Sequence, residues 1–195
     1  MNRNNSIACI ILLIIATLIS LTSASAQTEI MQGSFVFVPE RSGDIERAIE
    51  TATAKMNFLI KPLARSRLRE ITNPHQRIHI NFTDTEVELI ADDLPSSQTP
   101  LNGSSVLRRQ DNGDVVYVST LLDGGVLRQT LTAKNGQCLT EFTLSPIGQY
   151  MIVHVTIISP QLNEPVKYTA VYRKLQEQPG YDDKSMSRYA SIPLK

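Results

Sequence analysis

The sequence predicts a mainly β protein, an antiparallel up-and-down β-barrel of about 8–10 strands with a helical lid segment after the first strand. Turns containing Gly113, Gly125, Gly136 and Gly148 recur through the second half of the chain. Asn-Gly and Asp-Gly pairs at such turns supply the positive φ angles of tight hairpins. Between the turns, apolar residues often alternate with polar ones, the period of a strand with one buried face. A meander of such strands has two exposed edges unless it closes, so we expect a barrel.

The chain begins with the pattern of a secretory signal peptide. Arg3 gives a polar start its positive charge, Ile7–Leu21 is almost continuously apolar, and Ala24-Ser25-Ala26 supplies small residues before a cleavage site. The alternative is a retained membrane anchor, but the apolar run is shorter than the roughly 20 residues that span a bilayer. We expect residues 1–26 to be removed after Ala26, leaving a secreted or periplasmic protein.

The barrel domain is expected over residues 27–175, with a helical insertion at 44–71. Gly33–Val38 is the opening strand, and Ser42 and Asp44 are suited to cap the helix that follows. One apolar stripe then recurs at three- and four-residue steps: Ile45, Ala48, Ile49, Ala52, Met56, Leu59 and Ile60. Pro62 interrupts this helix, and a shorter one is predicted over Leu63–Ile71. We expect the first helix to lie across one open end of the barrel, with its stripe covering the mouth.

The remaining strands are predicted from alternation and from the turns. They are Ile78–Phe82, Val87–Ala91, Val115–Leu122, Val126–Ala133, Cys138–Leu144, Tyr150–Ile158 and Val166–Leu175. The first strand is expected beside the last, which completes the ring. Residues 176–195 mix Gln, Pro, Gly, Asp and Lys without periodicity, so we expect a flexible C-terminal tail.

Composition and charge exclude several classes of function. The 19 basic and 19 acidic residues balance, which argues against a nucleic-acid binder. The sequence has no nucleophile elbow, zincin or phosphate-loop motif, and no cofactor or metal site is predicted. Cys138 is the only cysteine after the leader, so no internal disulfide is expected, and its neighbours offer no base or cation to activate it. Asn81 and Asn102 match the glycosylation pattern, which has meaning only in a eukaryote.

A basic cluster in the helical insertion has two interpretations. Lys61, Arg65, Arg67, Arg69 and, shortly after the insertion, Arg77 are accompanied by one acidic residue, Glu70. The first interpretation is peripheral contact with an anionic membrane surface through Lys61, Arg65 and Arg69. The second is a solvated helix face that balances the acidic residues between 84 and 93.

The order of these elements resembles that of the lipocalin and fatty-acid-binding-protein superfamily, the calycins, and in particular small bacterial secreted lipocalin-like proteins. Gly33-Ser34-Phe35 stands where such barrels carry Gly-x-Trp, and Tyr172-Arg173 ends the final strand, where a basic residue packs across that aromatic. Ala170 stands where the carboxylate-binding arginine of fatty-acid-binding proteins is expected. The resemblance implies a barrel cavity for an apolar small molecule.

We therefore expect a binding protein for a small hydrophobic ligand rather than an enzyme. Two alternatives are a structural or interaction protein of the cell envelope with a filled barrel, and a hydrolase or isomerase that uses the lumen. Strand Tyr150–Ile158 is apolar on both faces, and His154 shares one face with Tyr150 and Ile152. The residues predicted to contact the ligand are Ile49, Met56, Tyr117, Phe142, Tyr150, Ile152, His154 and Tyr168.

Overall fold

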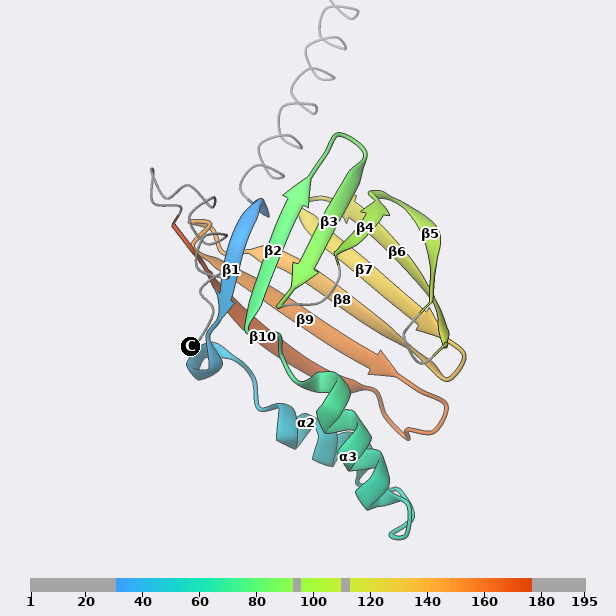
Figure 1. The fold of residues 1–195 in the computed structure, drawn as a ribbon. Coiled ribbons are helices and arrows are strands. Elements are labelled where there is room, and N and C mark those ends of the chain that lie inside the picture. Colours follow the sequence, from blue (N-terminus) through green and yellow to red (C-terminus); the bar gives the residue numbers. More distant parts are fainter. Residues whose placement is uncertain (1–30, 93–95, 110–112, 177–195) are drawn as a thin grey trace, which may run out of the picture.

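The computed structural model describes residues 31–92, 96–109 and 113–176. The predicted leader, its cleavage site and nearly all of the predicted tail lie outside these residues. One antiparallel sheet of ten strands curls into a nearly closed barrel, with the strand order β4-β3-β2-β1-β10-β9-β8-β7-β6-β5 (Figure 1). The up-and-down barrel predicted from the sequence is therefore confirmed.

Eight of the ten strands were predicted within a residue or two of their ends. The strands are β1 (Gly33–Phe37), β2 (Arg77–Phe82), β3 (Glu86–Ala91), β4 (Ser97–Pro100), β5 (Asn102–Arg109), β6 (Val115–Asp123), β7 (Val126–Ala133), β8 (Gly136–Leu144), β9 (Tyr150–Ile158) and β10 (Val166–Lys174). β1 pairs with β2 on one side and with β10 on the other, and Phe35 lies opposite both Ile78 and Lys174. The first strand thus closes the ring beside the last, as expected.

The seam of the barrel lies between β4 and β5, the two ends of the strand order. Arg108 on β5 crosses it: its Nη1 donates to the Ser96 carbonyl oxygen at 3.3 Å and its Nη2 donates to that of Gln98 at 2.8 Å. Inside the barrel, the hydroxyls of Thr99 and Thr120 are fully buried and hydrogen-bond at 2.7 Å. Side-chain hydrogen bonds therefore tie together two edges that the strand ladder leaves apart.

Between β1 and β2 the chain forms a short 3-10 helix η1 (Pro39–Arg41) and two α-helices, α2 (Ile45–Thr53) and α3 (Lys61–Thr72). The predicted cap is present, because the carboxylate of Asp44 accepts a hydrogen bond from the Arg47 amide at 2.9 Å. The predicted end of the first helix is wrong: α2 stops at Thr53, so Met56, Leu59 and Ile60 lie outside it. Asn57 explains the stop.

Asn57 builds a turn in place of a further helical turn. Its side-chain oxygen accepts a hydrogen bond from the Leu59 amide at 2.9 Å, and its carbonyl accepts from the amides of Ile60 and Lys61. Such local side-chain bonds compete with the helix. The apolar stripe is consequently divided between a buried part on α2 and an exposed part in the turn.

α2 packs against β10 and α3, and the two helices lie at one end of the barrel (Figure 1). Ile49 is 0% exposed and Ala52 is almost fully buried, and both join the cluster of buried apolar side chains that includes Phe35 and Tyr172. The buried half of the stripe is thus part of the main core.

The turn glycines serve two different needs. Gly113, Gly125 and Gly148 have φ angles of +84°, +79° and +67°, as the turn chemistry predicts. For Gly136 a positive φ was also expected, and this is wrong. A Cβ at Gly136 would lie 2.5 Å from the carbonyl oxygen of Ile158, so this residue is needed for the close approach of β8 and β9.

Candidate functional site

The barrel contains a partly open cavity of about 340 Å3 next to the C-terminal end of α3. Its wall comes from strands β2–β4 and β7–β10, and from residues 71–75 that lead from α3 to β2. The lining residues are Ile71, Asn73, Pro74, His75, Ile78, Leu89, Ala91, Ser97, Gln129, Leu131, Cys138, Thr140, Phe142, Val153, Val155, Tyr168, Ala170 and Tyr172. The wall is thus mostly apolar with a few polar groups, the usual character of a small-molecule site.

Two of the predicted ligand contacts, Phe142 and Tyr168, line this cavity. Phe142 lies on the inner face of β8, two residues from Thr140, and Tyr168 lies on the inner face of β10, two residues from Ala170. Side chains on one face of a strand recur every second residue, so each pair shares the inner face.

The other six predicted residues lie elsewhere. Tyr150, Ile152 and His154 occupy the outer face of β9, whose buried inner residues are Met151, Val153, Val155 and Ile157. His154 hydrogen-bonds there to the Thr169 hydroxyl at 3.0 Å. Tyr117 is half exposed, Met56 follows α2, and Ile49 is buried in the core without lining the cavity.

Several cavity residues were missed because their strands gave no clear signal in the sequence. They include Gln129, Thr140, Val153, Val155, Ala170 and Tyr172. The inner face of β7 contains the polar Gln129 beside Leu127 and Leu131, which blurs its alternation. Cross-strand partners carry the missing signal, since Val153 lies opposite both Phe142 and Ala170.

Burial in the cavity wall favours the uncharged forms of two tyrosines and the cysteine. Burial, with a smaller contribution from nearby Cys138, raises the pKa of Tyr168 to about 12. Burial likewise raises the pKa of Tyr172 and that of the Cys138 thiol, although the Thr140 hydroxyl acts on the thiol in the opposite direction. No lysine or arginine is among the described residues that line the cavity. The described wall therefore offers no lysine or arginine to pair with a negatively charged ligand.

At the α3 side of the cavity, His75 and Asp92 form an exposed pair. Nδ1 of His75 lies 3.1 Å from a carboxylate oxygen of Asp92, and the Arg77 amide donates to the other oxygen at 2.8 Å. Burial acts to raise the pKa of Asp92, but the hydrogen bonds from Arg77 and His75 outweigh it and lower that pKa. This pair fixes the segment between α3 and β2 against the end of β3.

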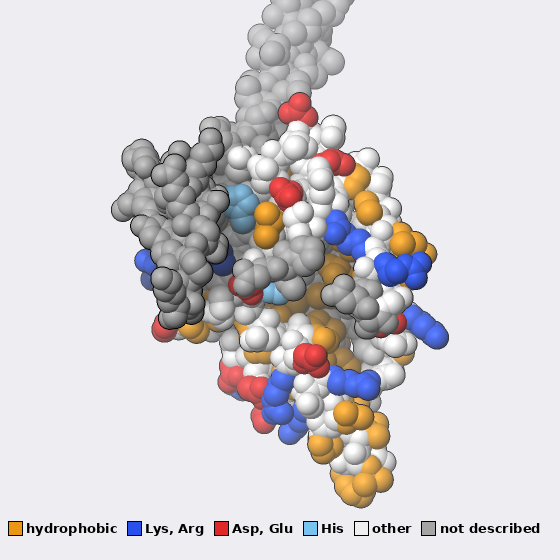
Figure 2. Space-filling model, in the orientation of Figure 1, with side chains coloured by type: hydrophobic (Ala, Val, Ile, Leu, Met, Phe, Trp, Pro, Cys, Tyr) orange, Lys and Arg blue, Asp and Glu red, His pale blue; other side chains and the backbone are white. Residues whose placement is uncertain are grey.

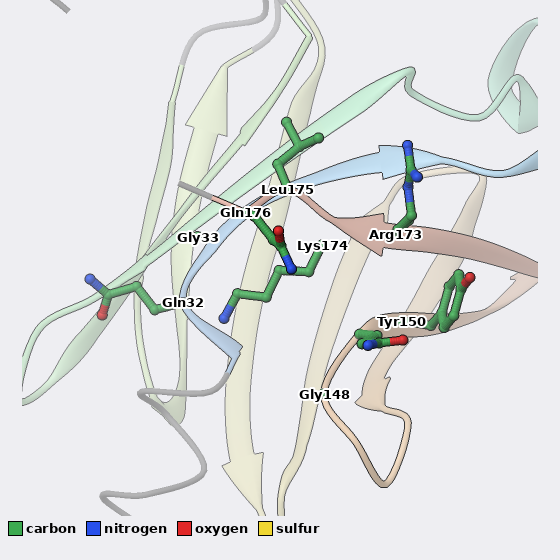
Figure 3. Close-up of a pocket in the computed structure, with 9 residues that line it drawn as sticks. Gln32, Gly33, Gly148, Tyr150, Arg173, Lys174, Leu175 and Gln176 are labelled. Carbon is green, nitrogen blue, oxygen red and sulfur yellow. The ribbon is translucent and has the colours of Figure 1, made fainter. Parts of the chain in front are cut away.

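A larger groove of about 1110 Å3 lies outside the lumen, at the ends of β1, β9 and β10. Figure 3 shows the polar side chains around it, among them Gln32, Tyr150, Arg173 and Lys174. Gln32 and Gln176 in its wall stand at or next to the ends of the described chain. The lumen cavity has the more apolar wall and is the better candidate for an apolar ligand.

The cation expected across the opening-strand aromatic is present, but it is not Arg173. Nζ of Lys174 lies 5.8 Å from the ring centroid of Phe35, within the range of a cation–π contact. The register pairs Phe35 with Lys174, so these two share the inner face while Arg173 is exposed on the outer one. On that outer face Arg41 lies over the ring of Tyr150, at 4.4 Å from its centroid.

Searches for a metal cluster and for a spanning helix were negative over the described ranges. No group of three or more His, Cys, Asp or Glu among these residues is arranged to hold a metal ion. No helix within them has the length and apolarity needed to cross a membrane.

Solved structures resemble this fold at low sequence identity. Fatty-acid-binding protein 1 of Echinococcus granulosus matches at 12% identity and a TM-score of 0.50, covering 76% of this chain and 99% of that protein. The chain has the barrel fold of the fatty-acid-binding proteins. A SAHS protein from Ramazzottius varieornatus also matches, at 12% identity and a TM-score of 0.51, over 74% of this chain and 94% of that one. No family model matches the sequence, and no curated protein does.

Proposed function

We propose that the protein is a secreted or periplasmic, non-enzymatic carrier that holds a small hydrophobic molecule in the barrel cavity. The observation that carries this proposal is the cavity in the lumen, whose wall is mostly apolar and has no lysine or arginine among its described residues. The shared fold with a protein named for binding fatty acids supports a small hydrophobic ligand. The extracytoplasmic location rests on the leader pattern of residues 1–26.

The cavity favours a carrier over the two alternatives. A filled barrel leaves no volume for a ligand, whereas this lumen retains about 340 Å3. For an enzyme, the cavity offers the Cys138 thiol as a nucleophile, but burial raises its pKa and keeps it protonated. A protonated thiol is a poor nucleophile.

Filling the cavity tests the carrier function. Ala170→Leu adds side-chain volume inside the lumen, and Thr156→Leu makes a comparable apolar substitution on the outer face of β9. Native mass spectrometry of protein secreted by its own source should show bound ligand on the parent and on Thr156→Leu, and none on Ala170→Leu. Retention of the ligand by a folded Ala170→Leu variant would contradict a lumen site. The same spectra give the N-terminus, expected at Gln27.

We further propose that the turn between α2 and α3 contacts a membrane surface. Four large apolar side chains are exposed there within six residues: Phe58 at 77%, Leu59 at 73%, Ile60 at 53% and Leu63 at 58%. Figure 2 shows hydrophobic side chains gathered at this tip, where the helical hairpin projects from the barrel. Exposed apolar groups next to basic residues are typical of interfacial membrane contact.

The basic residues beside this apolar tip differ in how their charges are engaged. Arg69 forms a two-bond ion pair with Glu46, at 2.8 and 2.9 Å, which offsets its charge. Lys61 donates to the Ala54 carbonyl and Arg65 to the Thr53 hydroxyl, both uncharged acceptors. Of the three cations first considered, Lys61 and Arg65 thus keep a net charge for anionic lipid.

Vesicle sedimentation tests the contact with the membrane. The parent should sediment with phosphatidylcholine vesicles that contain phosphatidylglycerol. A double variant, Phe58→Ser with Leu59→Ser, should bind at least about tenfold more weakly, because each apolar side chain contributes about 1.5–3 kcal/mol when buried. Ile147→Ser, at a residue 74% exposed in the β8–β9 turn, should bind like the parent. Equal binding by the double variant would refute the role of the tip.

A further inference from the structure

We propose that the carrier selects an uncharged ligand with a hydrogen-bond acceptor, such as a ketone or an ester, and that this acceptor binds the side-chain amide of Gln129. The inference rests on the proposed carrier function and deepens it by naming the chemistry of the ligand. It follows from two separate properties of the cavity: the nature of its wall, and one donor within it.

The wall of the cavity disfavours a carboxylate. A charged group that leaves water for a buried site needs a paired opposite charge, and no lysine or arginine is among the described lining residues. His75 is the one basic residue among the described lining residues, and its Nδ1 lies 3.1 Å from a carboxylate oxygen of Asp92. Lys174 lies on the inner face of β10 beyond Tyr172, but it lines the outer groove and its Nζ lies over the ring of Phe35.

The pKa values of the ionisable groups in the wall also indicate that the cavity disfavours a carboxylate. Burial raises the pKa values of Tyr168, Tyr172 and Cys138, so the cavity stabilises neutral over negatively charged forms of its own side chains. A ligand carboxylate placed beside them would meet the same environment.

Gln129 supplies a donor in this wall. Its Nε2 is buried and has no hydrogen-bond partner among the described residues. The register places it between Thr120 on β6 and Thr140 on β8. The Thr120 hydroxyl is bonded to Thr99, and that of Thr140 lies 3.8 Å from the Cys138 sulfur. Because a buried donor without a partner is costly, a ligand oxygen that accepts from Nε2 gains affinity there.

The volume of the cavity limits the size of the ligand. At the roughly 30 Å3 that one water molecule occupies in the liquid, a cavity of this volume holds a molecule of about ten heavy atoms. A medium-length ketone therefore suits it, and 2-nonanone and octanoate form a matched pair with the same number of heavy atoms and different charge.

Isothermal titration calorimetry with these two compounds tests the inference. The measurements are made on the whole mature protein, after removal of bound ligand, near pH 8, where octanoate is charged. The parent should bind 2-nonanone at least about tenfold more tightly than octanoate. Gln129→Leu removes the donor at similar size and should weaken binding of 2-nonanone about five- to tenfold. Gln137→Leu makes the same change at an exposed residue of β8 and should leave binding unchanged.

Each outcome is decisive. If octanoate binds as tightly as 2-nonanone, the selection for an uncharged ligand is wrong while the carrier function stands. If Gln129→Leu binds 2-nonanone like the parent, the assignment of the donor is wrong. If the parent binds neither compound and carries no ligand from its source, the proposed carrier function itself fails. Thermal unfolding of Gln129→Leu and Gln137→Leu shows whether the Gln129→Leu variant is folded, so that weaker binding can be assigned to the missing hydrogen-bond donor.

Discussion

Replacement of Ile49 by alanine measures whether the first helix belongs to the core or acts as a detachable lid. The side chain of Ile49 is 0% exposed and packs with the buried cluster of the barrel, whereas Leu59, on the same predicted stripe, is 73% exposed in the turn after α2. The sequence pattern treats these two residues alike, and the structure separates them completely.

The expected cost follows from burial. Truncating a fully buried isoleucine to alanine destabilises a protein by about 2–5 kcal/mol, through lost apolar contact and the cavity left behind. For a domain of about 150 residues, each kcal/mol lowers the Tm by about 2–4 °C. Ile49→Ala should therefore lower the Tm by about 10 °C, near the middle of this range. Leu59→Ala should change the free energy of unfolding by no more than about 0.5 kcal/mol.

Thermal unfolding followed by circular dichroism at a β-sheet wavelength is the appropriate assay. It reports the barrel, so a helix that detached independently would leave the transition in place. Equal midpoints for the parent and for Ile49→Ala would refute the assignment of α2 to the core. A large loss of stability in Leu59→Ala would refute the exposed turn instead.

Three further predictions concern the barrel itself. Gly136→Ala should cost about 1–3 kcal/mol, because the new Cβ would lie 2.5 Å from the Ile158 carbonyl oxygen, and chemical denaturation measures this. Arg108→Met should remove the bonds across the seam and speed hydrogen exchange in β4 and β5, while exchange in β9 stays slow. Tyr168 has a pKa of about 12 in the folded protein against about 10 unfolded, so the unfolded state releases its proton first. Its contribution is therefore complete below about pH 10 and is lost as the pH rises towards 12. Tyr168→Phe should flatten that decline in stability by about 2–3 kcal/mol, and a fall as steep as the parent's would contradict it.

The barrel could be predicted because turn glycines and strand alternation can be recognised from short stretches of sequence. The prediction was wrong or incomplete where other interactions decided the structure, at the end of the first helix and at β4. The helix predicted to reach Ile60 ends at Thr53, because the side chain of Asn57 bonds its own turn. β4 was not predicted because Ser97–Pro100 is short, polar and ends in proline, which removes a strand donor. Its place in the fold is set by pairing with β3 and by the buried Thr99–Thr120 bond, a contact between residues that are remote in the sequence.

The binding wall was harder to predict than the fold, because the sequence of β9 does not show which of its two faces points into the barrel. Both faces of Tyr150–Ile158 are apolar, and the phase chosen from the sequence alone put His154 and Ile152 on the candidate wall. The neighbouring strands decide the phase. Arg128 pairs with Glu141 at 2.8 Å on the outer face, which turns Leu127 inward.

From Leu127 the inner face can be followed across the sheet by register. Leu127 lies opposite Phe142, Phe142 opposite Val153, and Val153 opposite Ala170. Facing residues of paired strands share a side, so one charged pair on β7 and β8 fixes the inner face of four strands. The same phase brings Gln129, two residues after Leu127, into the wall. The side chain of Gln129 is polar but points inward because of the strand register. Its Nε2 is buried and has no hydrogen-bond partner among the described residues, so it can distinguish one apolar ligand from another.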